Sequence, residues 1–424
     1  MKYDLIVFGG GTSGIACAYI AAKKGLNTLL VEKTDVLGGA ITQGLVIPSM
    51  KTDTQNINTE FFNDLKVFAD KYNARTTYGD DNEAWFNPEL LKIVLDDMLS
   101  SVKCTVLFST EPIKVNFDEK LESFISTLNH KILSLYVESQ YIVDATSNGK
   151  IFQLLNLNFQ NSDENFQNPS LRFIMTNINL NAFSEWILEL DDNRDVTTSY
   201  NINNSLHLST AYTWDALKNW ALEPIFKMAI KNNDLQASDS AYFQLFTIPN
   251  MPNSIAFNCP RILLEDGENP NDPFVYSRCL KQGRERIYRL SNFLRKYFKG
   301  FENATISHIS DILGVRESYR IKGKSTYTKE DILSADKPQN IALACSYPID
   351  IHSNSSDSDK LEFTNHTYFL PIEALISEKY DNVYAVGRIL STDFEAQAAL
   401  RTQQSCFSMG EAVAKDIYKK LKKN

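Results

Sequence analysis

The sequence predicts an α/β fold in which a parallel β-sheet between helical layers is interrupted by an inserted α+β domain. At the start of the chain, the apolar run Lys2–Phe8 has the composition of a buried strand, and a helix is expected over Ser13–Lys24. A second strand follows over Asn27–Glu32, and this strand–helix–strand order is typical of parallel sheets. Near the other end, a strand over Val383–Val386 precedes a final helix. Both ends of the chain are therefore expected to build the same domain.

The turn between the first strand and the first helix contains Gly9, Gly11 and Gly14 in the pattern G-x-G-x-x-G. Gly9 permits a tight turn, Gly11 lets a pyrophosphate approach main-chain N–H groups, and Gly14 lets helix and strand pack closely. Glu32 ends the second strand, 32 − 14 = 18 positions after the last of these glycines. Its carboxylate can accept hydrogen bonds from the hydroxyls of an adenosine ribose. Together these features predict a Rossmann-type domain that binds a dinucleotide.

A second glycine pair, Gly38 and Gly39, favours FAD over NAD as that dinucleotide. In FAD enzymes the segment after the acidic residue passes the diphosphate and ribityl chain towards the flavin, and glycines permit that approach. A plain NAD dehydrogenase does not need them, although an ordinary glycine turn would also account for the pair. Near the C-terminus, Gly387 and Arg388 follow the predicted strand, and a loop of small residues leads to the last helix.

Several stretches together resemble the large family of FAD-dependent oxidoreductases with a glutathione-reductase-like FAD fold. More narrowly, they resemble a branch related to fumarate-reductase flavoproteins. The stretches are LGGAITQGLVIP, YIVDATSNGK, LGVRESYRIKGKSTYTKEDIL, YPIDIH and VGRILS with AALRTQQSCFSMGEA, and they span almost the whole chain. The resemblance implies FAD contacts at Gly9, Gly11, Thr12, Ser13, Gly14, Glu32, Lys33, Gly38, Gly39, Ala40, Gln43, Ala145, Gly387, Arg388, Gln403 and Gln404.

The chain departs from the family pattern at one turn and in the terminal helix, which has Val413 and Ala414 where the family usually reads AAG. The family usually has glycine after DAT, where this chain has Ser147, so we expect that turn to differ. In such a fold the last helix would point its N-terminus, near Gln403 and Gln404, at the pyrimidine edge of the flavin. A positive helix end there would stabilise the negative charge of reduced flavin. A helix that only caps the domain is the alternative, and in either case Cys406 is expected to pack inward, leaving FAD bound non-covalently.

Composition narrows the class of protein and its partners. A length of 424 residues suggests two or three domains, and a net charge of −9 argues against nucleic acid or an anionic membrane as the main partner. The six cysteines include no C-x-x-C pair, so we predict no metal site and expect reduced thiols in a cytoplasmic protein. No segment approaches 18 uninterrupted apolar residues, and Asp4 interrupts the apolar N-terminus, so neither a membrane span nor a signal peptide is expected.

The FAD domain is expected to be discontinuous. Residues 1–150 would form its first part, 301–424 its closing part, and 151–300 an inserted substrate domain. The stretch Thr105–Phe117 is expected to be one strand that crosses the adenine.

The insert has local signals of its own. SAYFQLFTIPNMPNSIAFNCPRI alternates around a Pro/Asn turn like a β-hairpin. Further on, Asp272 is expected to cap a helix that begins at Pro273.

Two clusters are candidates for the catalytic role. Flavin carries out hydride chemistry at N5, so the protein must position the substrate and manage protons. The segment GVRES supplies Arg316, whose guanidinium can hold a carboxylate or carbonyl group. YPIDIH supplies Asp350 and His352 on one face of a strand, so Asp350 could orient His352 for proton transfer near neutral pH. Structural ion pairs are the alternative. We expect the pocket between the flavin face and the inserted domain, lined by these residues and the loop around Gln43.

The sequence therefore predicts an FAD-dependent oxidoreductase that transfers a hydride between a small organic substrate and flavin N5. It leaves open whether the enzyme is a dehydrogenase, an oxidase or a double-bond reductase. A flavin-dependent monooxygenase, or a flavin-binding module of a modification or electron-transfer system, are the alternatives. Because only one G-x-G-x-x-G unit is present, we expect no dedicated NAD(P)H site. Electrons would then come from the substrate or be exchanged with a separate reductase or electron acceptor.

Overall fold

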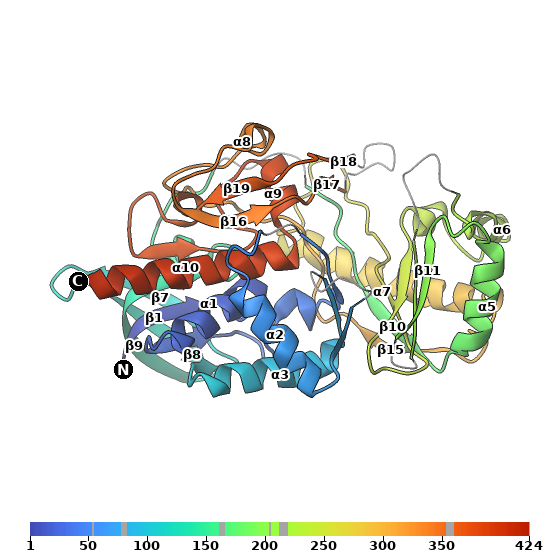
Figure 1. The fold of residues 1–424 in the computed structure, drawn as a ribbon, viewed down its shortest axis with the longest axis horizontal. Helices are drawn as coiled ribbons and strands as arrows, with labels where there is room; N and C mark the ends of the chain where they lie inside the picture. Colours follow the sequence, from blue (N-terminus) through green and yellow to red (C-terminus); the bar gives the residue numbers. More distant parts are fainter. Residues whose placement is uncertain are drawn as a thin grey trace.

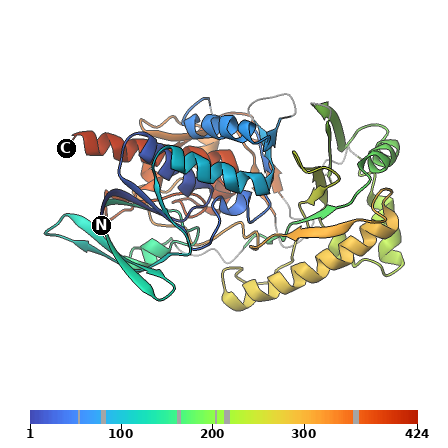
Figure 2. The same ribbon diagram turned by 90° about the horizontal axis from the view of Figure 1, so that it is seen from below.

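The computed structural model describes residues 1–52, 55–77, 83–160, 166–202, 205–211, 219–352 and 360–423. These residues form two large β-sheets, each packed against helices, and the sheets lie side by side in both ribbon views (Figures 1 and 2). The sheet near both chain termini contains parallel strands between helices, whereas the other is antiparallel. The predicted α/β fold with a Rossmann-type sheet and an inserted α+β part is confirmed.

The helices of the described residues are α1 (Thr12–Lys23), α2 (Glu60–Lys71), α3 (Pro88–Ser101), α4 (Lys150–Leu154), α5 (Leu180–Leu190), α6 (Glu223–Lys231), α7 (Pro273–Tyr297), α8 (Lys329–Ser334), α9 (Phe394–Leu400) and α10 (Gln403–Lys423), with 3₁₀ turns η1 (Gly39–Ile41), η2 (Ala237–Ser240) and η4 (Ile372–Leu375). The strands are β1 (Lys2–Phe8), β2 (Thr28–Val31), β3 (Pro48–Ser49), β4 (Arg75–Thr76), β5 (Ala84–Phe86), β6 (Thr105–Leu107), β7 (Glu111–Asp118), β8 (Ser123–His130), β9 (Leu133–Asp144), β10 (Phe173–Thr176), β11 (Thr197–Ile202), β12 (Ser205–Ala211), β13 (Gln244–Thr247), β14 (Ile255–Phe257), β15 (Thr305–Ile309), β16 (Ile341–Cys345), β17 (Ile349–Ile351), β18 (Lys360–Glu362), β19 (Tyr368–Pro371) and β20 (Val383–Ala385).

The first sheet has the strand order β6-β2-β1-β9-β8-β7, and β20 also pairs with β9. β6, β2, β1, β9 and β20 run parallel, while β8 and β7 continue from β9 as an antiparallel meander. The long strand β9 joins the two parts, because its first half pairs with β8 and its second half with β1 and β20. The pairing of β20 with β9 brings the C-terminal segment into the sheet that β1 begins.

The stretch Thr105–Phe117 is not the single strand that we expected. It forms β6 and then β7, which lie at opposite edges of the first sheet. The chain turns between them at Ser109, whose φ of +47° is left-handed and cannot continue an extended strand. The apolar alternation on both sides of Ser109 concealed this break.

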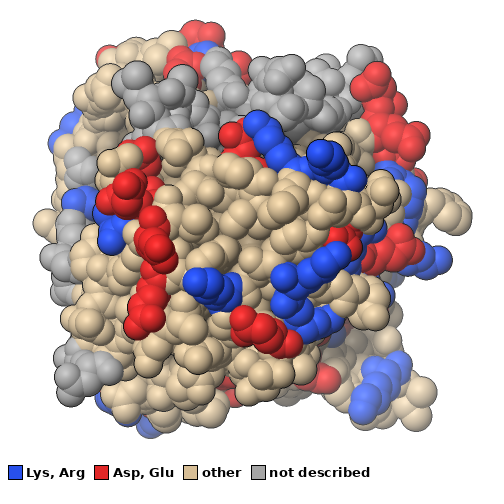
Figure 3. Space-filling view, turned by 90° about the vertical axis from the view of Figure 1, so that its right-hand side faces the viewer, with Lys and Arg blue, Asp and Glu red and all other residues tan. Residues whose placement is uncertain are grey.

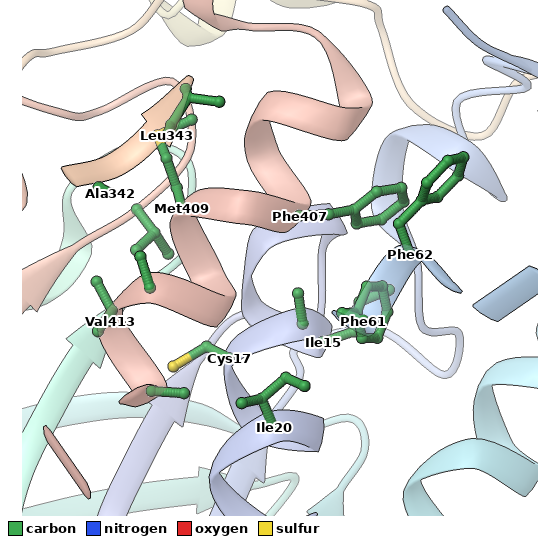
Figure 4. Close-up of a cluster of buried hydrophobic side chains, with 14 of the residues drawn as sticks. Ile15, Cys17, Ile20, Phe61, Phe62, Ala342, Leu343, Phe407, Met409 and Val413 are labelled. Atoms are coloured by element: carbon green, nitrogen blue, oxygen red, sulfur yellow. The ribbon is translucent and has the colours of Figure 1, made fainter. Parts of the chain in front are cut away.

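Both faces of the first sheet are apolar, because alternate residues of β1 enter two different cores. Leu5 and Val7 pack in a core with α1, α2, α3 and α10, while Ile6 and Phe8 pack in a core that α4 and the meander share. Figure 4 shows the first of these cores, where α10 lies between α1 and the strand β16, and Met409 of α10 points towards Leu343 of β16.

The second sheet has the order β11-β12-β13-β14-β10-β15, with antiparallel pairing throughout. Helices α5, α6 and α7 cover one face, and Figure 2 shows the long helix α7 running along it. The other face packs against Leu45, Ile47 and Trp85 from the first part of the chain. The second sheet therefore packs directly against the segment that follows Gly38 and Gly39.

Two local predictions for the insert are confirmed. The expected hairpin is formed by β13 and β14, and Asp272 caps α7 by accepting hydrogen bonds from the N–H groups of Phe274 and Val275. The second sheet ends with β15 at Ile309, beyond residue 300, where we expected the insert to end. The division into two domains itself stays a prediction.

Candidate active site

Two glycines in the turn from β1 to α1 are required by close packing. Gly9 has a φ of +100°, and a Cβ there would lie 2.4 Å from the carbonyl oxygen of Ala145. A Cβ on Gly14 would lie 1.9 Å from the carbonyl oxygen of Gly9. Both distances are far inside van der Waals contact, so β1, α1 and the end of β9 meet this closely only because these side chains are absent.

Gly11 differs, because a Cβ there would meet no heavy atom within 4 Å. It directly precedes α1, and no side chain caps the first N–H groups of that helix. Gly38 pairs with Gly11 in a parallel bridge, and a Cβ on Gly39 would approach the Cα of Gly11 to 3.2 Å. The result is an open space lined by main chain at the positive end of α1. This space fits the diphosphate of a dinucleotide.

Glu32 is buried, and both of its carboxylate oxygens are bonded to nearby loops. Oε2 accepts a hydrogen bond from the N–H of Gly10 at 2.6 Å, and Oε1 accepts from the N–H and the hydroxyl of Thr34, each at 2.8 Å. Glu32 therefore fixes the glycine turn against the loop that follows β2. Oε1 already accepts two hydrogen bonds, whereas Oε2 has a second lone pair for a ribose hydroxyl, and that contact stays a prediction.

The C-terminal segment reaches the same turn. A Cβ on Gly387 would lie 3.3 Å from Oγ of Ser13 at the start of α1. Arg388 donates from Nε to the carbonyl of Ser147 at 2.9 Å, and from Nη1 to the carbonyl of Val315. Ser147 has a φ of +67°, so this turn keeps the left-handed conformation that glycine favours, and Arg388 holds it in place. Burial lowers the pKa of Arg388 to about 10, which leaves it charged at neutral pH.

The last helix also lies against the first. A Cβ on Gly410 would lie 2.1 Å from the carbonyl oxygen of Ser13, so α10 and α1 cross in backbone contact. At the start of α10, Gln403 donates from Nε2 to the carbonyl of Val46 at 2.6 Å, and Gln404 accepts from Thr52. The Oε1 atom of Gln403 is buried and has no hydrogen-bond partner among the described residues. A ligand that reaches this helix end would supply the missing donor.

The remaining predicted FAD contacts are spread around the same turn. Thr12 is the first residue of α1, Lys33 is exposed two residues after the end of β2, and Ala40 is exposed in η1. Gln43 accepts hydrogen bonds at its carbonyl from the segment after β15, and its Oε1 lies 3.4 Å from the Thr34 hydroxyl. The part that each of these residues takes in binding FAD stays a prediction.

The structure brings the three predicted catalytic residues together. Nε2 of His352 lies 3.3 Å from Oδ2 of Asp350, at the end of β17. Arg316, in the irregular segment after β15, is close enough for its charge to lower the pKa of both. Its Nη1 donates to the carbonyl of Asn168, which leads into the second sheet. The three residues therefore lie where the two parts of the chain meet.

Three further arginines surround this group, and sequence reasoning missed them. Arg401 donates from Nη2 to Oδ2 of Asp350 at 3.1 Å and to its carbonyl at 2.9 Å. Arg261, just after β14, donates from Nη2 to Nδ1 of His352 at 2.8 Å. Arg172, just before β10, is near enough for its charge to act on Arg316. We call Arg172, Arg261, Arg316 and Arg401 the arginine cluster.

His352 is neutral at physiological pH. Burial, and then the charge of Arg316, lower its pKa from 6.5 to about 3. Because Arg261 donates to Nδ1, we assign the ring proton to Nε2, which faces Asp350. Burial alone would raise the pKa of Asp350, but the His352 hydrogen bond and the charge of Arg401 outweigh it and lower that pKa. The pair is therefore an ionised carboxylate beside a neutral imidazole whose two nitrogens both have protein partners.

The arginine cluster is joined to the FAD segments along the chain. Arg316 follows Val315, whose carbonyl accepts the hydrogen bond from Arg388. Gln397 of α9 donates from Nε2 to the carbonyl of Arg316 at 2.9 Å, and Arg401 lies between α9 and α10. Arg388 thus connects the turn at Ser147 to Val315, the residue that directly precedes Arg316 of the arginine cluster.

Neither a metal site nor a membrane-spanning helix is found among the residues that the structure describes. There, no group of three or more His, Cys, Asp and Glu side chains is placed to hold a metal ion. In the same part of the chain, no helix has both the length and the apolar content to span a membrane. Figure 3 shows the end of the molecule beyond the second sheet, where basic and acidic side chains stand in separate small groups. The predicted absence of a nucleic-acid partner stays a prediction.

Solved structures of two flavoenzymes share the fold of this chain. A flavin-dependent brominase of known structure is 12% identical, with a TM-score of 0.51 over 99% of this chain and 80% of its own. The p-nitrophenol 4-monooxygenase of Pseudomonas putida is 8% identical, with a TM-score of 0.51 over 100% of this chain and 81% of its own. At these identities the likeness concerns the fold alone.

One curated protein matches over a short stretch. A ferredoxin–NADP reductase of Mycoplasmoides gallisepticum is 62% identical over 37 residues, which are 9% of this chain and 11% of that protein. The family described as FAD dependent oxidoreductase matches residues 4–422. Because that match covers nearly the whole chain, the protein belongs to the FAD dependent oxidoreductase family, and FAD is its cofactor.

Proposed function

We propose that this enzyme transfers a hydride between a small organic substrate and N5 of its bound FAD. The observation that carries the proposal is the arginine cluster, which adjoins the FAD-binding segments through Arg388, Val315 and Gln397. An enzyme that leaves the chemistry to flavin needs fixed groups beside the ring to orient a substrate, and arginine suits that task. The narrower kinship with fumarate-reductase flavoproteins is part of this proposal.

The residues would divide the work as follows. The main chain around Gly11 holds the diphosphate, and Glu32 holds the ribose. When bound, FAD supplies a ring that accepts or donates a hydride. Arg316 binds a polar group of the substrate through its guanidinium. The contacts at Asn168 and Gln397 fix the main chain and one nitrogen of Arg316, so its side chain is held in one orientation.

For the Asp350–His352 pair, the contacts favour a positioning role over proton exchange. Both nitrogens of His352 are engaged, and a histidine with a pKa of about 3 is a weak base. The pair does link Arg401 to Arg261, so it sets the spacing of two arginines that come from different parts of the chain. Proton exchange by His352 would require the ring to give up one of these two contacts.

A flavin-dependent monooxygenase is the second candidate, since the fold is shared with a monooxygenase and a brominase. The two candidates differ in what reduces the flavin. In the first, the organic substrate itself reduces or reoxidises it. In the second, a nicotinamide or a separate reductase supplies the electrons, and oxygen enters the product.

Anaerobic spectroscopy of the purified holoprotein tests the proposal. We expect a member of a panel of small hydroxy, amino and saturated acids to bleach the flavin absorbance without oxygen, or an unsaturated acid to restore it after photoreduction. Rapid reduction by NADH or NADPH, followed by oxygen uptake that depends on the organic substrate, would favour the monooxygenase and contradict the proposal.

A further inference from the structure

The side-chain amide of Gln403 is buried, and only its nitrogen has a partner. Gln403 is the first residue of α10 and is 7% exposed. Its Nε2 donates to the carbonyl of Val46 at 2.6 Å. Since only the nitrogen of an amide can donate to a carbonyl, this contact fixes which way round the amide lies. Its Oε1 has no hydrogen-bond partner among the described residues, which indicates a donor that a ligand brings.

The first residues of α10 project past the start of α1, where the diphosphate fits. Gly410 lies against the carbonyl of Ser13, near the start of α1, and Nζ of Lys24, just after the end of α1, lies 5.6 Å from the ring centroid of Tyr418. The two helices therefore run in the same direction. The residues before the first of these contacts, Gln403–Met409, number 410 − 403 = 7 and extend about 10 Å beyond it. We call them the α10 overhang.

The flavin half of FAD is the half that can follow the chain to this overhang. Glu32, the predicted ribose ligand, holds the adenosine half beside the end of β2. A second path leaves the diphosphate site along the chain from Gly39, beside Gly11, to Val46, which Gln403 contacts. Along this path a flavin presents its ribityl hydroxyls first and its ring last. The oxidised ring carries a single N–H group, at N3, and its other polar ring atoms only accept hydrogen bonds.

We propose that Oε1 of Gln403 accepts a hydrogen bond from N3–H of the flavin ring, so that one amide joins the ring to the segment on which the second sheet rests. Leu45 and Ile47, on either side of Val46, pack with Phe246 of β13. Gln403 is thus a positioning residue, and FAD binding should reduce the local opening of this segment. The inference requires FAD as the cofactor but no particular redox chemistry.

Titration of the apoprotein with FAD and with 3-methyl-FAD, in which a methyl group replaces the N3 proton, tests the contact. We expect the wild type to bind FAD about 5–30-fold more tightly, the scale for leaving a buried acceptor unsatisfied, as followed by the quenching of flavin fluorescence. Gln403→Met should lose most of this preference. Gln404→Met should keep it, because Oε1 of Gln404 already accepts from Thr52. The same preference in Gln403→Met as in wild type would overturn the proposal and assign the donor to a ribityl hydroxyl.

Hydrogen exchange at the Val46 amide tests the link to the second sheet in the wild-type chain, so it does not depend on the folding of a variant. This N–H donates to the carbonyl of Ala40 at 3.0 Å and exchanges when the segment opens. At saturation, FAD should slow its exchange about 5–30-fold more than 3-methyl-FAD does. The Phe298 amide, bonded to Leu294 at the end of α7, should exchange equally with both flavins. Equal protection of Val46 by both flavins would contradict the link. Neither measurement includes a redox step, so failure of the hydride-transfer proposal would leave both expectations unchanged.

Discussion

Replacing Gly11 with alanine should weaken FAD binding without weakening the fold. Gly11 has φ −75° and ψ −174°, which alanine adopts freely, and the added Cβ would meet no heavy atom of the described residues within 4 Å. The stability of the apoprotein should therefore stay within about 0.5 kcal/mol of wild type, or rise slightly because the unfolded chain loses freedom. The methyl group would instead occupy the space of the diphosphate. Losing one charge-assisted hydrogen bond of about 1.5–3 kcal/mol corresponds to a roughly 10–150-fold higher Kd for FAD.

Gly14 provides the matched control, because its surroundings are the opposite. A Cβ there would lie 1.9 Å from the carbonyl oxygen of Gly9, and neither backbone segment can yield easily. Gly14→Ala should cost about 1–3 kcal/mol of stability through overpacking. The assays are urea unfolding of each apoprotein and titration of FAD, followed by the quenching of flavin fluorescence. Wild-type affinity in Gly11→Ala, or a stability loss as large as that of Gly14→Ala, would refute this account of the turn.

Three further predictions concern the cofactor and the arginine cluster. Glu32→Ala should lower FAD affinity by about 1–3 kcal/mol. It should also destabilise the apoprotein, because the N–H of Gly10 loses its acceptor. Unchanged retention of FAD would show that Glu32 does not bind the ribose. His352, with its pKa lowered to about 3, stays neutral when folded but takes up a proton below pH 6.5 when unfolded, so stability should fall as the pH drops from 6.5 towards 3. His352→Gln should reduce this slope by up to about 1.4 kcal/mol per pH unit in urea unfolding, and an unchanged slope would mean that the ring is protonated in the fold. Acid precipitation should release FAD into solution, whereas flavin retained on the precipitate would show a covalent link.

Features that depend only on residues close together in the sequence were predictable from it. The turn after β1 combines a short apolar strand, closely spaced glycines and a helix of small and apolar residues, all within one stretch of chain. The structure places Lys2–Phe8 as expected and starts α1 at Thr12. The break at Ser109 was missed because serine gives no sign that its backbone will turn left-handed.

The arginine cluster was only partly predictable, because it is assembled by the tertiary fold. Arg316, Asp350 and His352 stood in short polar segments with recognisable chemistry. Arg172, Arg261 and Arg401 each stand singly beside a strand or helix, and nothing local distinguishes them from surface arginines. The tertiary fold brings Arg261, beside the second sheet, to His352, and the packing of α9 against β17 brings Arg401 to Asp350.

A crystal structure of the holoprotein soaked with succinate would test the central claim most directly, namely that the glycine turn and the arginine cluster form one active site. We predict the diphosphate against the main chain of Gly11 and the flavin ring facing Arg316. The space between ring and guanidinium should hold one small molecule, whose reacting atom lies about 3–3.5 Å from flavin N5. A flavin ring separated from Arg316 by other protein side chains, with the arginine cluster out of reach of N5, would contradict the account.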